Sequence, residues 1–212
     1  MRRIATSDPP QTRDYRICAA SLLVVFALSA CSGRTAPAPP AAPQAVPATI
    51  QSNSPRAANV QATFAQGPGI AVTYMPALVP AGATAKVTSA SDGGASTVML
   101  DVSGLMPNRA YGAHAHTKNC GATGADSGPH FQHQKDPVTP SVDPAYANPQ
   151  NEIWLDFQTD AEGKATATSR VNWEFTDDAR PHSVVVHDHP TSTEPGKAGT
   201  AGDRAACVTV GF

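Results

Sequence analysis

Alternating apolar and polar residues recur through the second half of the chain and predict β-strands. Val98, Leu100 and Val102 alternate with polar neighbours, which is the period of a strand with one buried face. A cluster of small and polar residues at Ser91–Gly94 comes just before this run and is typical of a tight turn. We therefore expect a β-hairpin over residues 85–103.

Further strands are predicted downstream, and helical periodicity is poor after residue 59. The segments with strand character are 153–157, 165–175, 183–187 and 205–210. Short strands with Gly- and Pro-rich connections indicate an all-β sandwich or barrel. Two long irregular segments, 117–150 and 188–203, interrupt the strands, and long loops in a compact domain are often functional.

The first 58 residues have a different character. An apolar run at 17–28 follows a basic start and is shorter than the ~20 residues that span a bilayer, so it suits a secretory signal. The small residues before Cys31 resemble the lipobox of bacterial lipoproteins, which implies cleavage before Cys31 and lipid attachment to it. An ordinary signal peptide with a chance cysteine is the alternative. The six prolines of 31–58 are typical of an extended tether.

These features predict a signal peptide at 1–30, a linker carrying the lipidated Cys31 at 31–58 and a folded domain at 59–212. The protein would be exported and held at the outer face of the bacterial cell membrane by its lipid alone. Removing residues 1–30 takes four Arg and two Asp from the chain and changes the net charge from −2 to −4. The chain has no basic cluster, so a nucleic-acid partner is not expected.

The cysteines fit export. Of the four in the chain, Cys18 leaves with the signal and Cys31 is the proposed lipid site, so Cys120 and Cys207 remain as one pair. In an oxidising compartment such a pair is expected to form a disulfide.

Four of the seven histidines could converge from separate strands and loops. His114 and His116 lie two apart, so a strand would point both to the same side, where they can share one metal ion. His130 lies in the first long loop and His187 ends an apolar strand. A His-x-His pair alone also occurs by chance, but four converging imidazoles would suit copper.

An ordered series of motifs resembles the copper/zinc superoxide dismutase family over nearly all of 62–212. The motifs are Gly112-Ala-His-Ala-His116, Cys120, Gly128-Pro-His-Phe131, Val185-Val-His187 and Gly199-Thr-Ala-Gly-Asp-Arg-Ala-Ala-Cys207. The resemblance implies an eight-stranded Greek-key β-sandwich or flattened barrel with long metal-site loops. It also implies a copper-dependent enzyme that converts superoxide to oxygen and hydrogen peroxide.

The resemblance also implies roles for individual residues. The implied copper ligands are His114, His116, His130 and His187. His130 would be the bridging histidine of members with two metals, and it would also deliver a proton to the product. Arg204 would attract and orient the superoxide anion beside the copper. Cys120 and Cys207 would form the family's intradomain disulfide.

The sequence departs from the family where zinc is expected. The segment 148–156, which matches the end of the family's zinc site, has no histidine, and His133 lies closer to His130 than the family's spacing. Zinc prefers about four ligands, mostly nitrogen or sulfur, and this loop offers two nitrogens. We therefore expect a copper-only site. Glu152 or Asp156 would then orient His130 from behind, unless both are solvated charges at a strand edge.

Two more departures fall after the last ligand. The loop that follows His187 is shorter than in many family members, and the aspartate that joins the two metal sites in the family has no counterpart near Thr191. Asp203 is an unusual neighbour of Arg204 and would partly cancel its attraction for anions. The remaining histidines of this region are predicted to lie at the surface: His182 and His189.

The expected function is therefore an exported, lipid-anchored, copper-only superoxide dismutase. The alternatives are a copper-binding or storage lipoprotein with little or no dismutase activity, and a structural sandwich without metal chemistry. The complete set of four histidines disfavours the structural protein, and a mere copper binder would not need Arg204. No feature of the sequence indicates an oligomeric state.

Overall fold

Eleven β-strands and one 3-10 helix make up the described part of a computed structural model, which comprises residues 51–54 and 57–212. The strands are β1 Gln51–Ser54, β2 Ala57–Thr63, β3 Ala71–Thr73, β4 Thr84–Asp92, β5 Ala95–Ser103, β6 Ala110–Tyr111, β7 Ala113–His116, β8 Phe157–Gln158, β9 Ala165–Val171, β10 Ser183–His187 and β11 Arg204–Thr209. The 3-10 helix η1 covers Gly124–Ser127.

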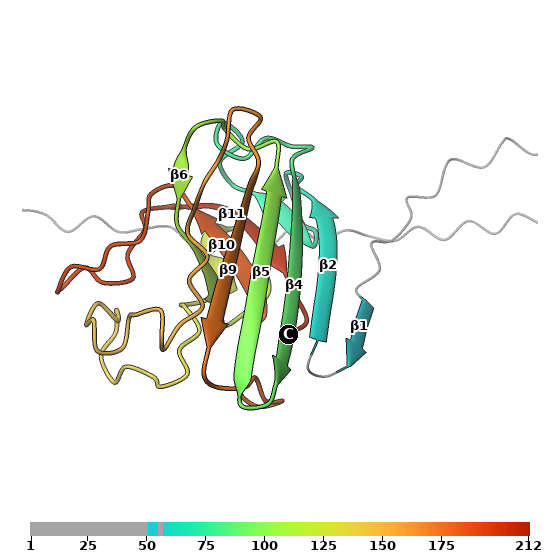
Figure 1. The fold of residues 1–212 in the computed structure, drawn as a ribbon. Helices are drawn as coiled ribbons and strands as arrows, with labels where there is room; N and C mark the ends of the chain where they lie inside the picture. Colours follow the sequence, from blue (N-terminus) through green and yellow to red (C-terminus); the bar gives the residue numbers. More distant parts are fainter. Residues whose placement is uncertain (1–50, 55–56) are drawn as a thin grey trace, which may run out of the picture. The chain divides into compact units, whose positions relative to one another are not determined.

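Two antiparallel sheets form the layers of a sandwich, which confirms the all-β prediction. One sheet has the order β1-β2-β4-β5-β9 and the other β3-β11-β10-β7, while β6 and β8 form a small third sheet. In Figure 1, β9, β5, β4 and β2 face the viewer, and β10 and β11 lie behind them. Strands distant in sequence are neighbours in the second sheet, so the chain crosses repeatedly between the layers.

Several predicted elements are confirmed closely. The hairpin over 85–103 is β4 and β5, with Val87 paired to Leu100. Its turn carries Gly93 and Gly94 at positive φ, a conformation that glycine adopts without strain. Strand β10 has the predicted bounds, and the segments 117–150 and 188–203 contain no strand.

The segment 153–157 differs from its prediction. Only Phe157 belongs to a strand, β8, whereas Glu152 and Trp154 make isolated bridges to Gln132 and His114. Backbone bonds to β7 persist, with Leu155 N–H donating to the Ala113 carbonyl at 2.7 Å. The pairing of this segment is irregular because it forms backbone bridges both to β7 and to the first long loop.

The core lies between the two sheets. From the first sheet, Val87, Val98 and Leu100 are buried at 0 to 1% exposure, and from the second sheet Val184 and Val186 are buried equally. Removal of such apolar surface from water, at roughly 25 cal/mol per Å², is the main stabilising contribution to the fold. The alternation read from the sequence therefore identified the core face correctly.

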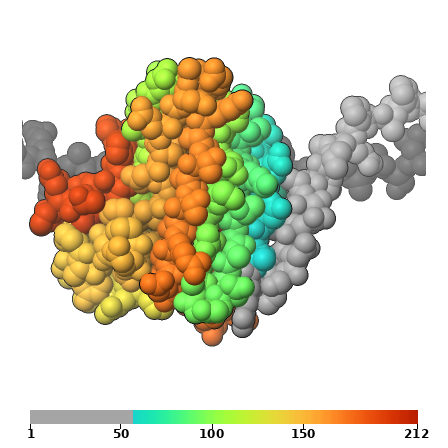
Figure 2. Space-filling view, viewed as in Figure 1, coloured from blue at the N-terminus to red at the C-terminus, as the bar shows by residue number. Residues whose placement is uncertain are grey.

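The second sheet is buried on both faces, and this arrangement creates the site. Every residue of β7 and β10 is buried, although only one face meets the other sheet. The long loops cover the opposite face. In Figure 2 the light-orange spheres of the first loop form a continuous surface along one side of the sandwich.

The predicted signal peptide, Cys31 and the linker up to residue 50 lie outside the described residues. Strand β1 and the start of β2 fall within the segment assigned to the linker from sequence. Nowhere in 51–54 or 57–212 is there a helix with the length and apolar character needed to cross a membrane.

Candidate metal centre

Two strands and one loop bring four histidines together on the covered face of the second sheet. Ala113 and Ala115 of β7 point into the core, so His114 and His116 point the other way. His187 ends the neighbouring strand β10, in register opposite Arg204 of β11. His130 comes from the first long loop and pairs by an isolated bridge with His116.

The cluster has the dimensions of a metal site. One nitrogen from each of the four imidazoles lies within 4.8 Å of all the others. Nitrogens bound to one ion at about 2.0–2.1 Å are separated by roughly 3–4 Å, so small side-chain shifts would close the site on an ion. Among residues 57–212 this is the one group of three or more His, Cys, Asp or Glu side chains with such geometry.

Buried nitrogens without partners give an independent sign that a cation fits. His114 Nδ1 and His187 Nδ1 are buried and have no hydrogen-bond partner among the described residues. The Nε2 atoms of His187 and His116 face each other at 3.4 Å. An unsatisfied buried polar atom costs about 1–3 kcal/mol, and metal coordination would supply what is missing.

The environment keeps these imidazoles neutral, which is the form that binds metals. Burial, reinforced by the neighbouring imidazoles, lowers the pKa of His114 and His116 well below the ordinary value. The same burial lowers the pKa of His187 to about 3. Imidazole nitrogen suits copper, zinc, iron and nickel, so the donor set alone fits copper without selecting it.

His130 is held from behind by a carboxylate. Its Nδ1 lies 2.9 Å from Oε2 of Glu152, whose side chain is 2% exposed. Trp154 Nε1 donates to the same oxygen at 2.7 Å, and Gln132 Nε2 donates to Oε1 at 2.8 Å. Of the two carboxylates predicted from sequence to orient His130, Glu152 is the one that contacts it. The alternative, that Glu152 is a solvated charge at a strand edge, is wrong.

The ring of His116 is fixed in a similar way by the backbone. Its Nδ1 lies 2.9 Å from the Gly128 carbonyl, which can only accept a hydrogen bond. Nδ1 therefore carries the proton, and Nε2 presents its lone pair to the cluster.

Asp156 lies beside the other end of the cluster. Its Oδ1 is 3.8 Å from His114 Nε2 and 2.7 Å from the Thr191 hydroxyl, which itself lies 2.6 Å from the same imidazole nitrogen. Asp156 thus contacts the surroundings of His114 rather than His130.

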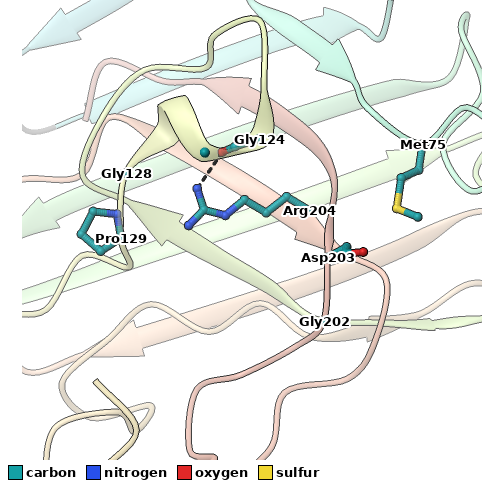
Figure 3. Close-up of a pocket in the computed structure, with 8 residues that line it drawn as sticks. Met75, Gly124, Gly128, Pro129, Gly202, Asp203 and Arg204 are labelled. Carbon is teal, nitrogen blue, oxygen red and sulfur yellow. Dashed lines mark hydrogen bonds between the residues drawn. The ribbon is translucent and has the colours of Figure 1, made fainter. Parts of the chain in front are cut away.

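Arg204 pairs with His187 across β11 and β10 and lines an open hollow of about 680 Å³. Figure 3 shows its guanidinium reaching under η1, where Nη1 donates to the Gly124 carbonyl at 2.6 Å and to Ser127 Oγ at 3.0 Å. A Cβ on Gly124 would lie 2.8 Å from Arg204 Cβ, so glycine is needed for this approach. The remaining donors of the guanidinium are available to an anion in the hollow.

Asp203 lines the same hollow and is exposed. Its backbone N–H donates to Asp188 Oδ1 at 2.6 Å, which holds the turn beside Arg204. A fixed cation and a carboxylate therefore line the same hollow.

The remaining histidines lie outside the cluster. His133 is exposed and stacks on Trp173, with ring centroids 4.8 Å apart and an interplanar angle of 7°. His189 is 66% exposed and bonds Asp188 at 2.8 Å, and His182 is half-buried. Cys120 and Cys207 are joined by a disulfide that ties the first long loop to β11.

Sequence reasoning did not identify Gln132, Trp154 or Thr191 as part of the site. The sequence pattern could have indicated Trp154. It alternates with Ile153 and Leu155, so a strand would place it on the same side as Glu152. Gln132 and Thr191 lie in loops, whose course no periodicity indicates.

The chain is similar to a known protein family and to several solved structures. The family model described as copper/zinc superoxide dismutase matches residues 81–210. A copper/zinc superoxide dismutase from Brucella abortus is similar at 18% identity and a TM-score of 0.49, covering 71% of this chain and 98% of its own. A double mutant of a SOD-like protein from Bacillus subtilis is similar at 16% identity and 0.45, covering 58% and 86%.

No curated protein matches the chain in sequence. The family model spans more than half of the chain, including all four clustered histidines, Arg204 and both disulfide cysteines. The chain belongs to the copper/zinc superoxide dismutase family.

Proposed function

We propose that the protein is a copper-dependent superoxide dismutase that works without zinc. The observation that carries the proposal is the contact between His130 Nδ1 and the buried carboxylate of Glu152 at 2.9 Å. Because the carboxylate takes up Nδ1, His130 would have only Nε2 left to hold copper. The ring would then have no nitrogen left for a second metal such as zinc.

The four histidines would hold the copper: His114, His116, His130 and His187. Copper in this setting would supply the one-electron chemistry that converts superoxide to oxygen and hydrogen peroxide. The remaining steps belong to the chain itself, which must attract an anion, orient it and supply a proton.

Arg204 would attract and orient the anion. Its guanidinium keeps its charge at all physiological pH values, and its contacts with η1 hold it in one position before superoxide arrives. Because those contacts already exist, little reorganisation is needed when superoxide binds.

His130 would carry the proton. Glu152 accepts from Nδ1–H, so Nε2 is the atom that can take up a proton and pass it on. The carboxylate would stabilise the positive charge that the ring gains in that step. The side chain of His130 is 19% exposed, so solvent can reach it and exchange protons with it.

Metal loading with a superoxide assay tests the proposal. The purified metal-free chain would be loaded with copper, zinc or both, its metal content measured by mass spectrometry, and superoxide removal followed after pulse radiolysis. We expect about one copper per chain and full activity with copper alone. Activity that needs zinc would overturn the copper-only proposal, and stoichiometric copper without activity would indicate a copper-binding lipoprotein instead.

We also propose that the chain is exported and anchored through a lipid on Cys31, on the strength of the lipobox-like sequence. Expression with radiolabelled palmitate in a bacterial host should label the membrane fraction. Cys31→Ser should lose the label and leave the membrane, while Cys18→Ser should keep both. Unlabelled wild-type protein in the soluble fraction would contradict the anchor.

A further inference from the structure

A chain of polar contacts runs outward from His114, on the side of the ring that faces away from the cluster. His114 Nε2 lies 2.6 Å from the Thr191 hydroxyl, and that hydroxyl lies 2.7 Å from Asp156 Oδ1. The imidazole is fully buried, so bulk water cannot replace these contacts. Thr191 comes from the loop after β10, and Asp156 comes from the segment just before β8.

The directions of these hydrogen bonds follow from the number of protons available. A carboxylate oxygen only accepts, so the single proton of the Thr191 hydroxyl goes to Asp156 Oδ1. The hydroxyl oxygen must then accept from His114, which places the ring proton on Nε2. Nδ1 is left with its lone pair, and this is the buried atom of His114 for which residues 57–212 provide no partner.

Asp156 is held in the orientation that this arrangement needs. Its Oδ2 accepts from the Thr191 backbone N–H at 2.8 Å, and its Oδ1 accepts from the Ala113 backbone N–H at 3.3 Å. Both backbone groups are fixed donors, so the carboxylate is clamped between β7 and the loop after β10.

Gly112 allows the loop to approach this closely. A Cβ at this position would lie 2.7 Å from the His189 carbonyl oxygen and 3.0 Å from the Thr191 hydroxyl. The Gly112 backbone N–H donates to that carbonyl at 2.7 Å, which fixes the loop two residues before Thr191.

We propose that Thr191 and Asp156 are positioning residues that fix the tautomer of His114 and so present Nδ1 to the copper. The part of this inference that concerns copper rests on the proposed function, whereas the tautomer is a property of the metal-free chain. Glu152 acts on His130 and the Gly128 carbonyl on His116, so the Thr191–Asp156 pair supplies the same control for a third ligand.

Nitrogen-15 NMR of the metal-free chain tests the tautomer directly. Long-range proton–nitrogen correlations should show His114 with its proton on Nε2. In Asp156→Asn, the Asn oxygen should stay with the Thr191 N–H and turn the amide NH₂ toward the hydroxyl. The hydroxyl would then donate to His114, and the ring proton would move to Nδ1.

Three further variants complete the design. Thr191→Val removes the hydroxyl and should leave the two tautomers mixed, Thr191→Ser keeps the hydroxyl and should behave as the unaltered chain, and Thr200→Val is the matched control. Thr200 is exposed in the same loop, and its hydroxyl donates to the Lys197 carbonyl. If Thr191→Val fails to fold, Asp156→Asn and Thr191→Ser decide the question.

Copper affinity, measured by competition with a chelator, gives the second readout. Loss of an outer hydrogen-bond partner of a metal-bound histidine typically costs about 10- to 100-fold in affinity, and we expect this loss for Thr191→Val and Asp156→Asn. The inference is overturned if His114 carries its proton on Nδ1 in the unaltered chain, or if neither variant changes the tautomer. A chain without dismutase activity that still showed the tautomer shift would refute the proposed function and leave this inference standing.

Discussion

Glu152 is an ionisable side chain buried beside the histidine cluster. Three side chains around the cluster donate hydrogen bonds to Glu152. Its two oxygens accept from His130, Trp154 and Gln132 at 2.7 to 2.9 Å. A buried charge without such partners would cost several kcal/mol. The donors make the charge tolerable, and the charge in turn fixes the ring of His130.

Glu152→Gln should therefore weaken the site without changing its size. The amide must turn its NH₂ group toward at least one of the three donors, which leaves that donor unpaired and loosens His130. We expect a loss of about 10- to 100-fold in copper affinity or superoxide removal, measured by chelator competition and pulse radiolysis. Glu162→Gln, at an exposed position, is the control and should change neither quantity. Full affinity and activity in Glu152→Gln would refute this role.

Arg204 and Asp203 set the charge of the hollow that they both line. Arg204→Met should lower the rate constant for superoxide by about tenfold or more and reduce its dependence on ionic strength, because a focused positive field raises the encounter rate of an anion.

Asp203→Asn should raise the rate constant for superoxide and steepen its salt dependence, because it removes an opposing charge from the hollow. Pulse radiolysis over a series of salt concentrations measures both. A slower Asp203→Asn variant would show that the carboxylate supports Arg204.

At the scale of elements, alternation predicted strands well where one face is buried and the other is solvated. The hairpin of β4 and β5 follows this rule. The two-residue period also placed His114 and His116 on one face of β7, although both faces of that strand are buried. The strand prediction fails for 153–157, although Ile153, Leu155 and Phe157 are buried in alternation with less buried neighbours, because this segment pairs mainly by isolated bridges.

The four clustered histidines could be predicted because their motifs lie in or beside strands, and because the family resemblance ordered them. The residues behind these histidines could not be predicted in the same way. Gln132 reaches Glu152 only because the first long loop folds back on itself, with Gln132 Nε2 also donating to Ser141 at 2.9 Å. Thr191 reaches His114 only because Gly112 admits the second loop. Contacts of this kind depend on three-dimensional loop packing, which leaves no periodic pattern in the sequence.

The disulfide joins an irregular loop to a central strand, so its removal tests how far the loop depends on it. Cys120 and Cys207 are 87 residues apart, and cross-linking a loop of this length is worth roughly 4 kcal/mol in the chain-entropy model. Cys120→Ser with Cys207→Ser should lower the free energy of unfolding by about this amount in urea titrations. Because the loop also carries η1 and the contacts of Arg204, superoxide removal should fall as well. An unchanged free energy of unfolding would mean that packing alone holds the loop.

At the scale of the whole molecule, the histidine cluster also makes the stability of the fold depend on pH. The second sheet is covered on both faces, so three imidazoles are buried within the fold: His114, His116 and His187. In the metal-free chain these rings stay neutral, and none is an exposed group that water can solvate after protonation. The cluster thus holds three basic imidazoles in positions where the folded state cannot easily accept protons.

Acid should therefore destabilise the metal-free protein steeply. Burial lowers the pKa of His187 to about 3 and that of the other two rings well below 6.5, whereas in the unfolded chain all three would titrate near the ordinary value. Between these limits the unfolded state binds more protons, so stability is fully present above about pH 6.5 and is lost as the pH falls toward 3. Each ring contributes a slope of up to about 1.4 kcal/mol per pH unit.

Urea unfolding of the metal-free chain from pH 8 to pH 4 measures this slope. We expect a plateau above about pH 7 and a decline below it. His187→Asn removes one titrating ring and should make the decline shallower by about one proton, whatever its effect on stability at neutral pH. Excess copper at pH 7 should add stability by mass action, since it binds only the folded cluster, and acid should release it as protons compete for the same nitrogens. A free energy of unfolding that stays level from pH 7 to pH 4 would mean that the unoccupied cluster opens and admits protons before the fold is lost.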